Sequence, residues 1–337
     1  MFIIIFFLVF LFPFNSFSWD NATHRLIVNS AITSKLLQKD LQKILDENKS
    51  ELLSGVIASD KEDIYKFHDE QICKINIKEI MEKLLTKTDS KEIAYELGRI
   101  SGYISDMNEP LKLEKVEGEQ FYTVVKYEIG VAKQNFEITG LSAPVYIASL
   151  DDYFSQVSLR TGKYYDEIIG SVDNIEVVKD TTRELIVNSI NDTLSIWWTA
   201  YENILLNELE STVVFSDDFI NVSDKYLSLG QKEKARQFLI TGIRRNPESV
   251  ILYKKLGRFY VKNDLSGFAV DVYLAWLERK PDDFEICREL ALAYESMQES
   301  APLTFGKYEK KAIEQWEKLL NTAYDDEAKT HLKALGE

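Results

Sequence analysis

A spacing of 34 residues recurs in the C-terminal third of the chain and constrains its fold more than any other feature. Tyr226, Tyr260 and Tyr294 follow one another at this spacing, and Pro247 and Pro281 keep the same step. A fixed period of this length is typical of repeats in which each unit is a helix pair that buries its apolar face against its neighbours. The C-terminal third is therefore expected to be a stack of helix pairs.

The middle copy shows how two helices of one pair would pack. Small residues, Gly257 and Ala269, stand where antiparallel helices must cross closely, and large residues between them fill the gaps. With Tyr253, Leu256, Tyr260, Tyr273 and Pro281, they fall at positions that resemble the consensus of a tetratricopeptide repeat. A longer inter-helix loop, "QESAPLTFG", precedes the second helix of the third copy. The resemblance implies tetratricopeptide repeats over 216–330, with three helix pairs and a concave face for a protein or peptide partner.

The region before the repeats is rich in helix signals and poor in strand signals. Segments 93–107, 124–136 and 177–209 carry apolar residues at three- and four-residue spacing. The short segment 70–77, "EQICKINI", could be a strand or a loop. Residues 210–218 are the expected boundary between the two units. The sequence therefore predicts an all-α protein.

The N-terminal segment "MFIIIFFLVFLFPF" is almost wholly apolar, and no charged residue precedes Asp20. It is too short to span a bilayer comfortably as a helix. It ends in "NSFS", with Ser16 and Ser18 at the small-residue positions that a signal peptidase prefers. We expect 1–18 to be a signal peptide, with an uncleaved anchor as the alternative. The mature chain would then begin at Trp19 and be periplasmic or secreted.

The charge balance excludes one class of partner. The chain has 55 acidic and 40 basic residues, a net charge of −15. Such a chain repels phosphate backbones, so broad nucleic-acid binding is unfavourable. Cys73 and Cys287 fall in different units and are expected to be buried small hydrophobes rather than a disulfide.

The chain contains three histidines, and two of them lie close to acidic residues in the first unit. His24 follows the expected new terminus by five residues, which puts an α-amine, a carbonyl and an imidazole within reach of one another. Asp60 and His68 come next, and Asp106 lies near the end of a helix in "SGYISDMNEPLK". Nitrogen and carboxylate groups of this kind are zinc ligands. His331, near the tail, is expected to be exposed to solvent.

Taken singly, these residues also have ordinary interpretations. His24 could be a helix histidine without a ligand, His68 a surface histidine, and the two aspartates caps or solvated residues. Gly98 and Gly102 form a small-residue stripe with neighbouring serines, which favours the close approach of another helix. The metal-site interpretation depends on the residues occurring together.

Together, the order Trp19, His24, Asp60, His68 and Asp106 resembles the all-helical superfamily of zinc-dependent phospholipases C and fungal-type single-strand nucleases. In that superfamily the amino and carbonyl groups of a mature tryptophan bind zinc, and the His, Asp and His follow in this order. "SDMNEPL" resembles the later motif, an Asp followed by Pro-Leu. The resemblance covers 19–210. It implies a metal site of these five residues, with Asp60 and Asp106 as the catalytic carboxylates and Asp106 as a bridge between zinc ions.

The chain departs from the superfamily at two positions. Gly102 stands where the superfamily has a histidine four residues before the Asp, and Lys112 stands for the histidine after Pro-Leu. No histidine lies between His68 and His331, so the resemblance implies one or two zinc ions, or none. Lys112 would place an ammonium where a third cation binds in the superfamily. The expected function is hydrolysis of a phosphodiester or phospholipid with a reduced metal site. The alternative is an inactive pseudoenzyme that acts through its repeats.

Overall fold

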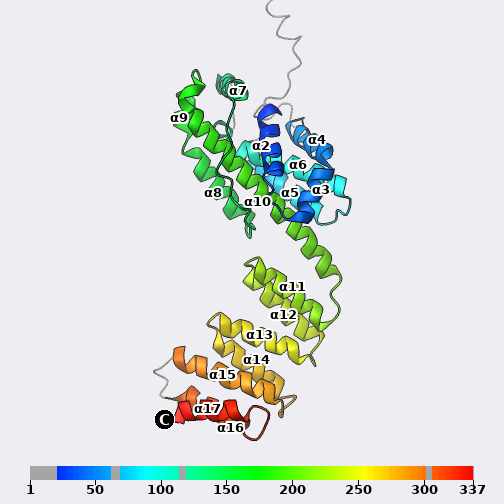
Figure 1. Ribbon diagram of the computed structural model, residues 1–337, viewed down its shortest axis with the longest axis vertical. Coiled ribbons are helices and arrows are strands. Elements are labelled where there is room, and N and C mark those ends of the chain that lie inside the picture. The colour runs from blue at the N-terminus through cyan, green and yellow to red at the C-terminus, as the bar shows by residue number, and fades with distance from the viewer. Residues whose placement is uncertain (1–20, 62–68, 114–118, 301–305, 337) are drawn as a thin grey trace, which may run out of the picture. The chain divides into compact units, whose positions relative to one another are not determined.

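Every regular element in the described part of the protein is helical (Figure 1). The computed structural model describes residues 21–61, 69–113, 119–300 and 306–336, and these ranges contain sixteen α-helices, two short 3-10 helices and no strand. The all-α prediction is confirmed. No helix in these ranges is long and apolar enough to cross a membrane. The expected signal peptide lies outside the described residues.

The chain divides into two compact units, Met1–Asn207 and Glu208–Glu337. The division falls near the end of the long helix α10, slightly before the segment 210–218 expected from the sequence. The helices of the first unit are α2 (Asn21–Thr33), α3 (Lys39–Glu47), α4 (Lys49–Lys61), α5 (Glu70–Leu84), α6 (Ser90–Met107), α7 (Glu119–Ala132), α8 (Leu150–Gly162), α9 (Tyr165–Ile169) and α10 (Lys179–Ser211), with 3-10 helices η1 (Pro110–Lys112) and η2 (Ile175–Val178).

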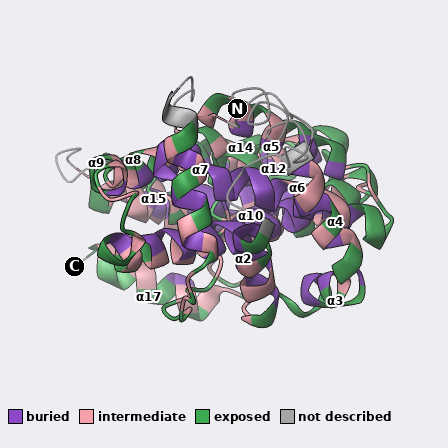
Figure 2. Cartoon of the chain, turned by 90° about the horizontal axis from the view of Figure 1, so that it is seen from above, coloured by how far each residue is buried: buried purple, intermediate pink, exposed green. Residues whose placement is uncertain are grey.

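Helices α6 and α10 carry much of the core of the first unit and are largely buried (Figure 2). Helix α6 begins after Asp89, whose carboxylate accepts hydrogen bonds from the backbone N–H groups of the first turn. Trp197 of α10 is fully buried, and its indole N–H donates to the carbonyl of Leu97 at 2.9 Å and to the hydroxyl of Ser101 at 3.0 Å. Trp197 therefore fixes the two helices against each other through apolar packing and a satisfied polar atom.

The small-residue stripe on α6 is a helix crossing. A Cβ on Gly98 would lie 2.0 Å from the carbonyl oxygen of Leu52 on α4, and one on Gly55 of α4 would lie 1.9 Å from the carbonyl oxygen of Tyr95. The two backbones thus touch where both helices lack side chains. Gly102 faces the side chain of Ser59, also on α4. The packing interpretation of the stripe is confirmed.

Segment 70–77 is neither a strand nor a loop but the first half of helix α5. Asp69 caps this helix by accepting the N–H of Ile72 at 2.9 Å. Cys73, Ile77 and Ile80 are buried at three- and four-residue spacing. The strand or loop interpretation was wrong because the helical spacing becomes visible only when the apolar residues after the alternating isoleucines are included.

After α10, the described residues of the second unit form a row of seven helices, of which the first six make three pairs. These are α11 (Ser216–Ser228) with α12 (Lys232–Arg245), α13 (Val250–Lys262) with α14 (Ser266–Leu277), and α15 (Phe284–Ser300) with α16 (Lys307–Glu317), followed by α17 (Asp325–Gly336). Gly257 of α13 has no room for a side chain, since a Cβ there would lie 2.2 Å from the ring of Tyr273 on α14. Ala269 is fully buried in the same pair. The small residues singled out by the repeat spacing therefore lie at helix contacts. Both cysteines are buried thiols rather than members of a disulfide, as expected.

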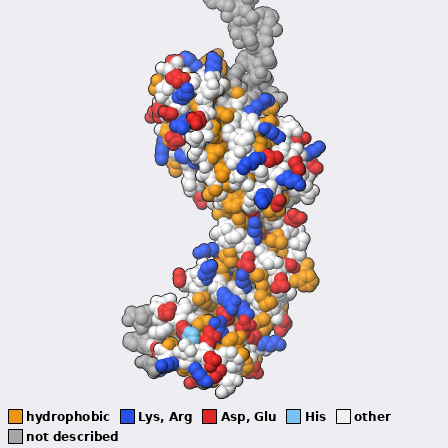
Figure 3. Space-filling model, viewed as in Figure 1, with side chains coloured by type: hydrophobic (Ala, Val, Ile, Leu, Met, Phe, Trp, Pro, Cys, Tyr) orange, Lys and Arg blue, Asp and Glu red, His pale blue; other side chains and the backbone are white. Residues whose placement is uncertain are grey.

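A row of ion pairs links helices α11, α13, α15 and α17. Three of these ion pairs join residues that are 31 positions apart in the sequence. The fourth joins residues 39 positions apart, because the third copy of the repeat is longer. Basic and acidic side chains are intermixed on the face of this unit that Figure 3 shows. The pairs are Asp224 with Lys255, Lys254 with Glu285, Arg258 with Glu289, and Arg288 with Glu327. We call this set the ion-pair row.

His331 was predicted to be exposed to solvent, but its side chain is partly buried. Its ring stacks on Trp316 with centroids 4.2 Å apart, and its Nδ1 lies 2.9 Å from a carboxylate oxygen of Glu295. The side chain is 29% exposed. The prediction failed because the sequence around His331 is polar, whereas its partners come from distant helices.

Replacing Ala269 with leucine should unfold the second unit at a lower temperature. The residue is fully buried between two helices, and adding three carbon atoms to a packed core costs about 1–3 kcal/mol or more. Ala275→Leu on the exposed side of the same helix is the control. Thermal unfolding followed by circular dichroism measures both, and equal melting for the two variants would contradict the packing role of Ala269.

Candidate functional site

A buried group of five ionisable side chains lies where the sequence predicted part of the metal site. His24 comes from α2, Asp106 from the end of α6, Glu109 from the turn after it, Lys112 from η1, and Glu128 from α7. None of the five is more than 2% exposed. We call this group the charge cluster.

The local backbone explains how three members of the charge cluster meet. Asp106, Glu109 and Lys112 follow one another at three-residue spacing, and Pro110 prevents α6 from continuing. The chain instead makes two successive tight turns, in which Glu109 N–H donates to Asp106 C=O and Lys112 N–H donates to Glu109 C=O, each at 3.0 Å. Side chains three residues apart lie above one another in such turns. The sequence Asp-x-x-Glu-Pro-x-Lys therefore places all three on one side.

The Lys112 ammonium is the centre of the charge cluster. Its Nζ lies 3.0 Å from Asp106 Oδ1, 3.1 Å from Glu109 Oε2 and 3.0 Å from Glu128 Oε1. The imidazole of His24 approaches the same Asp106 oxygen, with Nε2 at 3.4 Å. Asp106 Oδ1 is thus shared between an imidazole and an ammonium.

Burial changes the ionisation of this group. Removal from water raises the pKa of Glu109 well above its usual range, and Lys112 offsets this only in part. Burial raises the pKa of Glu128 in the same way. Burial alone would lower the pKa of Lys112, but the three carboxylates outweigh it and raise that pKa well above its usual value. Lys112 therefore stays charged, while both glutamates favour the protonated form more than an exposed carboxyl does.

A second polar group holds the neighbouring end of α6. Asn108, which ends the helix, donates to Asp192 of α10 at 2.8 Å, and its amide oxygen accepts a hydrogen bond from Arg160 of α8 at 3.0 Å. Arg160 and Tyr153 also bond the Asp192 carboxylate. Three helices are thereby tied together next to the charge cluster.

The structure brings together two of the five predicted metal ligands. His24 and Asp106 are in contact in the charge cluster. Asp60 lies in the last turn of α4, but its side chain, like Trp19 and His68, lies outside the described residues. The convergence of all five, and the separation of His24 from His68, therefore stay predictions.

The described donors fit a zinc ion in part. An imidazole and a carboxylate are suitable zinc ligands, and zinc takes four. Within the described ranges no group of three or more His, Cys, Asp or Glu has the arrangement of a metal site. Beside Asp106, the Lys112 ammonium occupies the position in which a metal ion would contact the carboxylate. At Gly102, where the superfamily has a histidine, a Cβ would lie 1.9 Å from the Ser59 hydroxyl, so a larger residue there would require Ser59 to move.

Sequence reasoning did not single out Glu109 and Glu128. A usable signal for Glu128 was present, because it shares a helix face with Val124, Tyr127 and Val131, which are all buried. A charged residue on such a face needs a buried partner. For Glu109, the signal was its three-residue spacing from both Asp106 and Lys112.

Comparison of this chain with family models, with characterised proteins and with solved structures finds no match. The resemblance to zinc phospholipases C and nucleases therefore rests on the motif residues alone, and the resemblance to tetratricopeptide repeats rests on the 34-residue spacing and the helix pairs.

Proposed function

We propose that this chain is an exported protein-binding protein, in which a catalytically inactive unit related to zinc phosphodiesterases precedes tetratricopeptide repeats that hold the partner. The observation that carries the proposal is Lys112, whose ammonium lies within 3.1 Å of three carboxylates at a site with no more than 2% exposure. A zinc hydrolase needs an open coordination position that water and a phosphate can reach. In the charge cluster the Lys112 ammonium, rather than a metal ion with an open position, contacts the carboxylates.

The second unit supports the protein-binding half of the proposal. Its three helix pairs, close contacts at Gly257 and buried Ala269 are the features expected of tetratricopeptide repeats. Stacked repeats of this kind expose an extended surface to a partner segment. A protein or peptide is accordingly the proposed partner, and export follows from the apolar N-terminal segment.

Removal of metal ions tests the proposal that the first unit is catalytically inactive. If Lys112 stabilises the charge cluster, prolonged treatment with EDTA should leave the melting temperature of the protein with its native N-terminus unchanged. A zinc ion bound at 100 times its Kd would add about 2.7 kcal/mol of stability, so its removal would lower the melting temperature by several degrees. The same protein with added zinc should not hydrolyse bis(p-nitrophenyl) phosphate. Zinc-dependent hydrolysis would refute the proposal.

A second candidate, a zinc-dependent phosphodiesterase with one or two metal ions, is favoured by the contact between His24 and Asp106. In this case Trp19, Asp60 and His68 would complete the ligand set, and bound zinc would supply an activated water. Protein with its native N-terminus would then contain zinc by elemental analysis, and His24→Ala would release it. An unchanged and negligible zinc content in both proteins would remove this candidate.

A further inference from the structure

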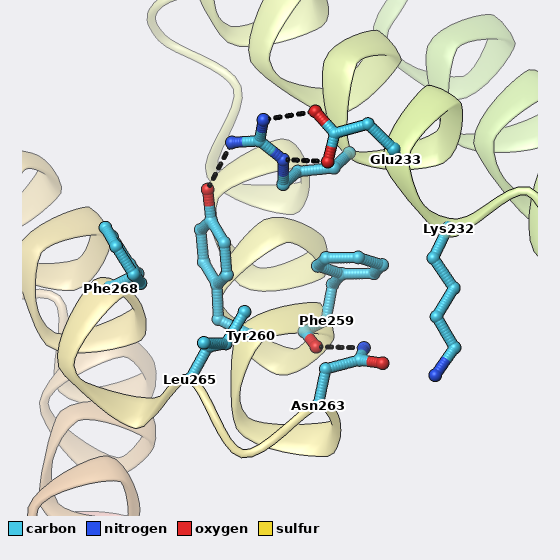
Figure 4. A pocket seen from close by; sticks show the side chains of 8 residues that line it. Lys232, Glu233, Phe259, Tyr260, Asn263, Leu265 and Phe268 are labelled. Atoms are coloured by element: carbon cyan, nitrogen blue, oxygen red, sulfur yellow. Dashed lines mark hydrogen bonds and ion pairs between the residues drawn. The ribbon is translucent and has the colours of Figure 1, made fainter.

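A pocket of about 350 Å³ opens in the second unit between helix α12 and the turn that joins α13 to α14. Its apolar part comes from Phe259 and Tyr260 of α13 and from Leu265 and Phe268 at the start of α14 (Figure 4). Phe259 and Tyr260 are nearly buried, but Leu265 is 41% and Phe268 56% exposed. The pocket thus has a rigid aromatic floor and a wall of large apolar side chains that face water.

The floor of the pocket is held in place by polar contacts. Arg236 of α12 bonds both carboxylate oxygens of Glu233 and reaches the Tyr260 hydroxyl at 3.4 Å. The rings of Tyr260 and Phe268 lie with centroids 5.4 Å apart. The pocket is therefore preorganised, which lowers the entropic cost of binding.

The rim of the pocket is positively charged although the protein is acidic. Lys232 and Arg236 contribute two positive charges and Glu233 one negative charge, so the lining carries +1 in a chain of −15. Arg236 already neutralises Glu233, whose pKa this contact lowers to about 2. In the described part of the chain Lys232 has no carboxylate within ion-pair distance. Asn263 uses one amide hydrogen to bond the carbonyl of Phe259 at 2.7 Å and keeps the second for a ligand.

We propose that this pocket binds an acidic peptide segment that places a large apolar side chain against Phe268 and Leu265 and a carboxylate beside Lys232 and Asn263. This inference rests on the proposed protein-binding function and names the surface and the chemistry of the partner. Exposed apolar side chains beside a cation without an ion pair fit such a segment, because aromatic anchors supply most binding energy and charge complementarity selects the partner.

A fluorescein-labelled peptide with one phenylalanine flanked by glutamates tests the inference by fluorescence anisotropy with the full chain. Phe268→Ala should weaken binding about tenfold or more, because it removes the anchoring contact. Lys232→Glu should weaken it by a similar factor. Phe284→Ala and Lys310→Glu, exposed outside this pocket, are matched controls and should bind as the wild type does. A peptide with glutamines in place of glutamates should bind several-fold more weakly.

Three outcomes would overturn the inference: no binding of the acidic peptide, equal binding of the glutamine peptide, or an equal loss in the control variants. Photo-crosslinking in the producing cell distinguishes a wrong assignment of this pocket from a wrong proposal of protein binding. Crosslinks to a protein from other positions of the second unit, but not from position 268, would leave the protein-binding function standing without this pocket. The absence of crosslinks from every position would reject both.

Discussion

Replacing Lys112 with methionine should strongly destabilise the first unit. The variant keeps most of the unbranched side chain but leaves Asp106, Glu109 and Glu128 buried without their shared ammonium. Removing one partner of a buried ion pair typically costs about 3–5 kcal/mol. Urea unfolding followed by tryptophan fluorescence should show this loss, or the variant should fail to accumulate as folded protein.

Two further variants make this prediction decisive. Lys126→Met removes an exposed lysine of α7 that pairs with Asp173, and it should cost less than about 1 kcal/mol. Adding Glu109→Gln and Glu128→Gln to Lys112→Met removes two of the uncompensated carboxylates and should restore part of the lost stability. If Lys112→Met were as stable as Lys126→Met, the ammonium would not be the element that stabilises the charge cluster.

Gly98→Ala should also damage the first unit, although alanine is the better helix former. The new Cβ would lie 2.0 Å from the backbone oxygen of Leu52, so α4 and α6 must move apart as whole helices. Overpacking costs about 1–3 kcal/mol, and occasionally more, whereas the gain in helix propensity is about 1 kcal/mol. Because a backbone cannot yield as a flexible side chain does, we expect a net loss of about 2 kcal/mol.

Gly130→Ala provides the matched control for Gly98→Ala. Gly130 lies in α7 of the same unit, and a Cβ there would meet Ile175 at an ordinary distance of 3.5 Å. This variant should gain up to about 1 kcal/mol from helix propensity. Equal unfolding midpoints for the two variants would show that α4 and α6 do not cross in tight backbone contact.

The helical character of the protein could be predicted from the sequence because the apolar spacing is regular over long segments. The 34-residue period indicated the helix pairs, and small residues such as Gly257 marked their contacts. The prediction for segment 70–77 was wrong because a short alternating run does not distinguish a strand from part of a helix. The prediction that His331 is exposed was wrong because its contacts with Trp316 and Glu295 depend on how α15, α16 and α17 pack.

The candidate site was predictable only in part. His24 and Asp106 were singled out and do meet, and Lys112 was expected to place a cation near them. The helix face of Glu128 indicates that it needs a buried partner, but the identity of that partner depends on α7 folding over the turn after α6, which no local pattern encodes. Burial cannot be measured from the residue pattern either, and burial is what makes the charge cluster a structural core rather than an open site.

The ion-pair row has a consequence for how the second unit assembles. Helix pairs of similar shape can dock in the wrong order, and misassembly of this kind is a characteristic failure of repeat proteins. Here α11 presents Asp224 to α13, which faces both neighbours with basic residues, while α15 presents acid to α13 and Arg288 to α17. Docking α11 against α15 in place of α13 would bring Asp224 toward Glu285 and Glu289, which carry the same charge. The ion-pair row therefore favours the native order of the helices over an order that places α11 beside α15.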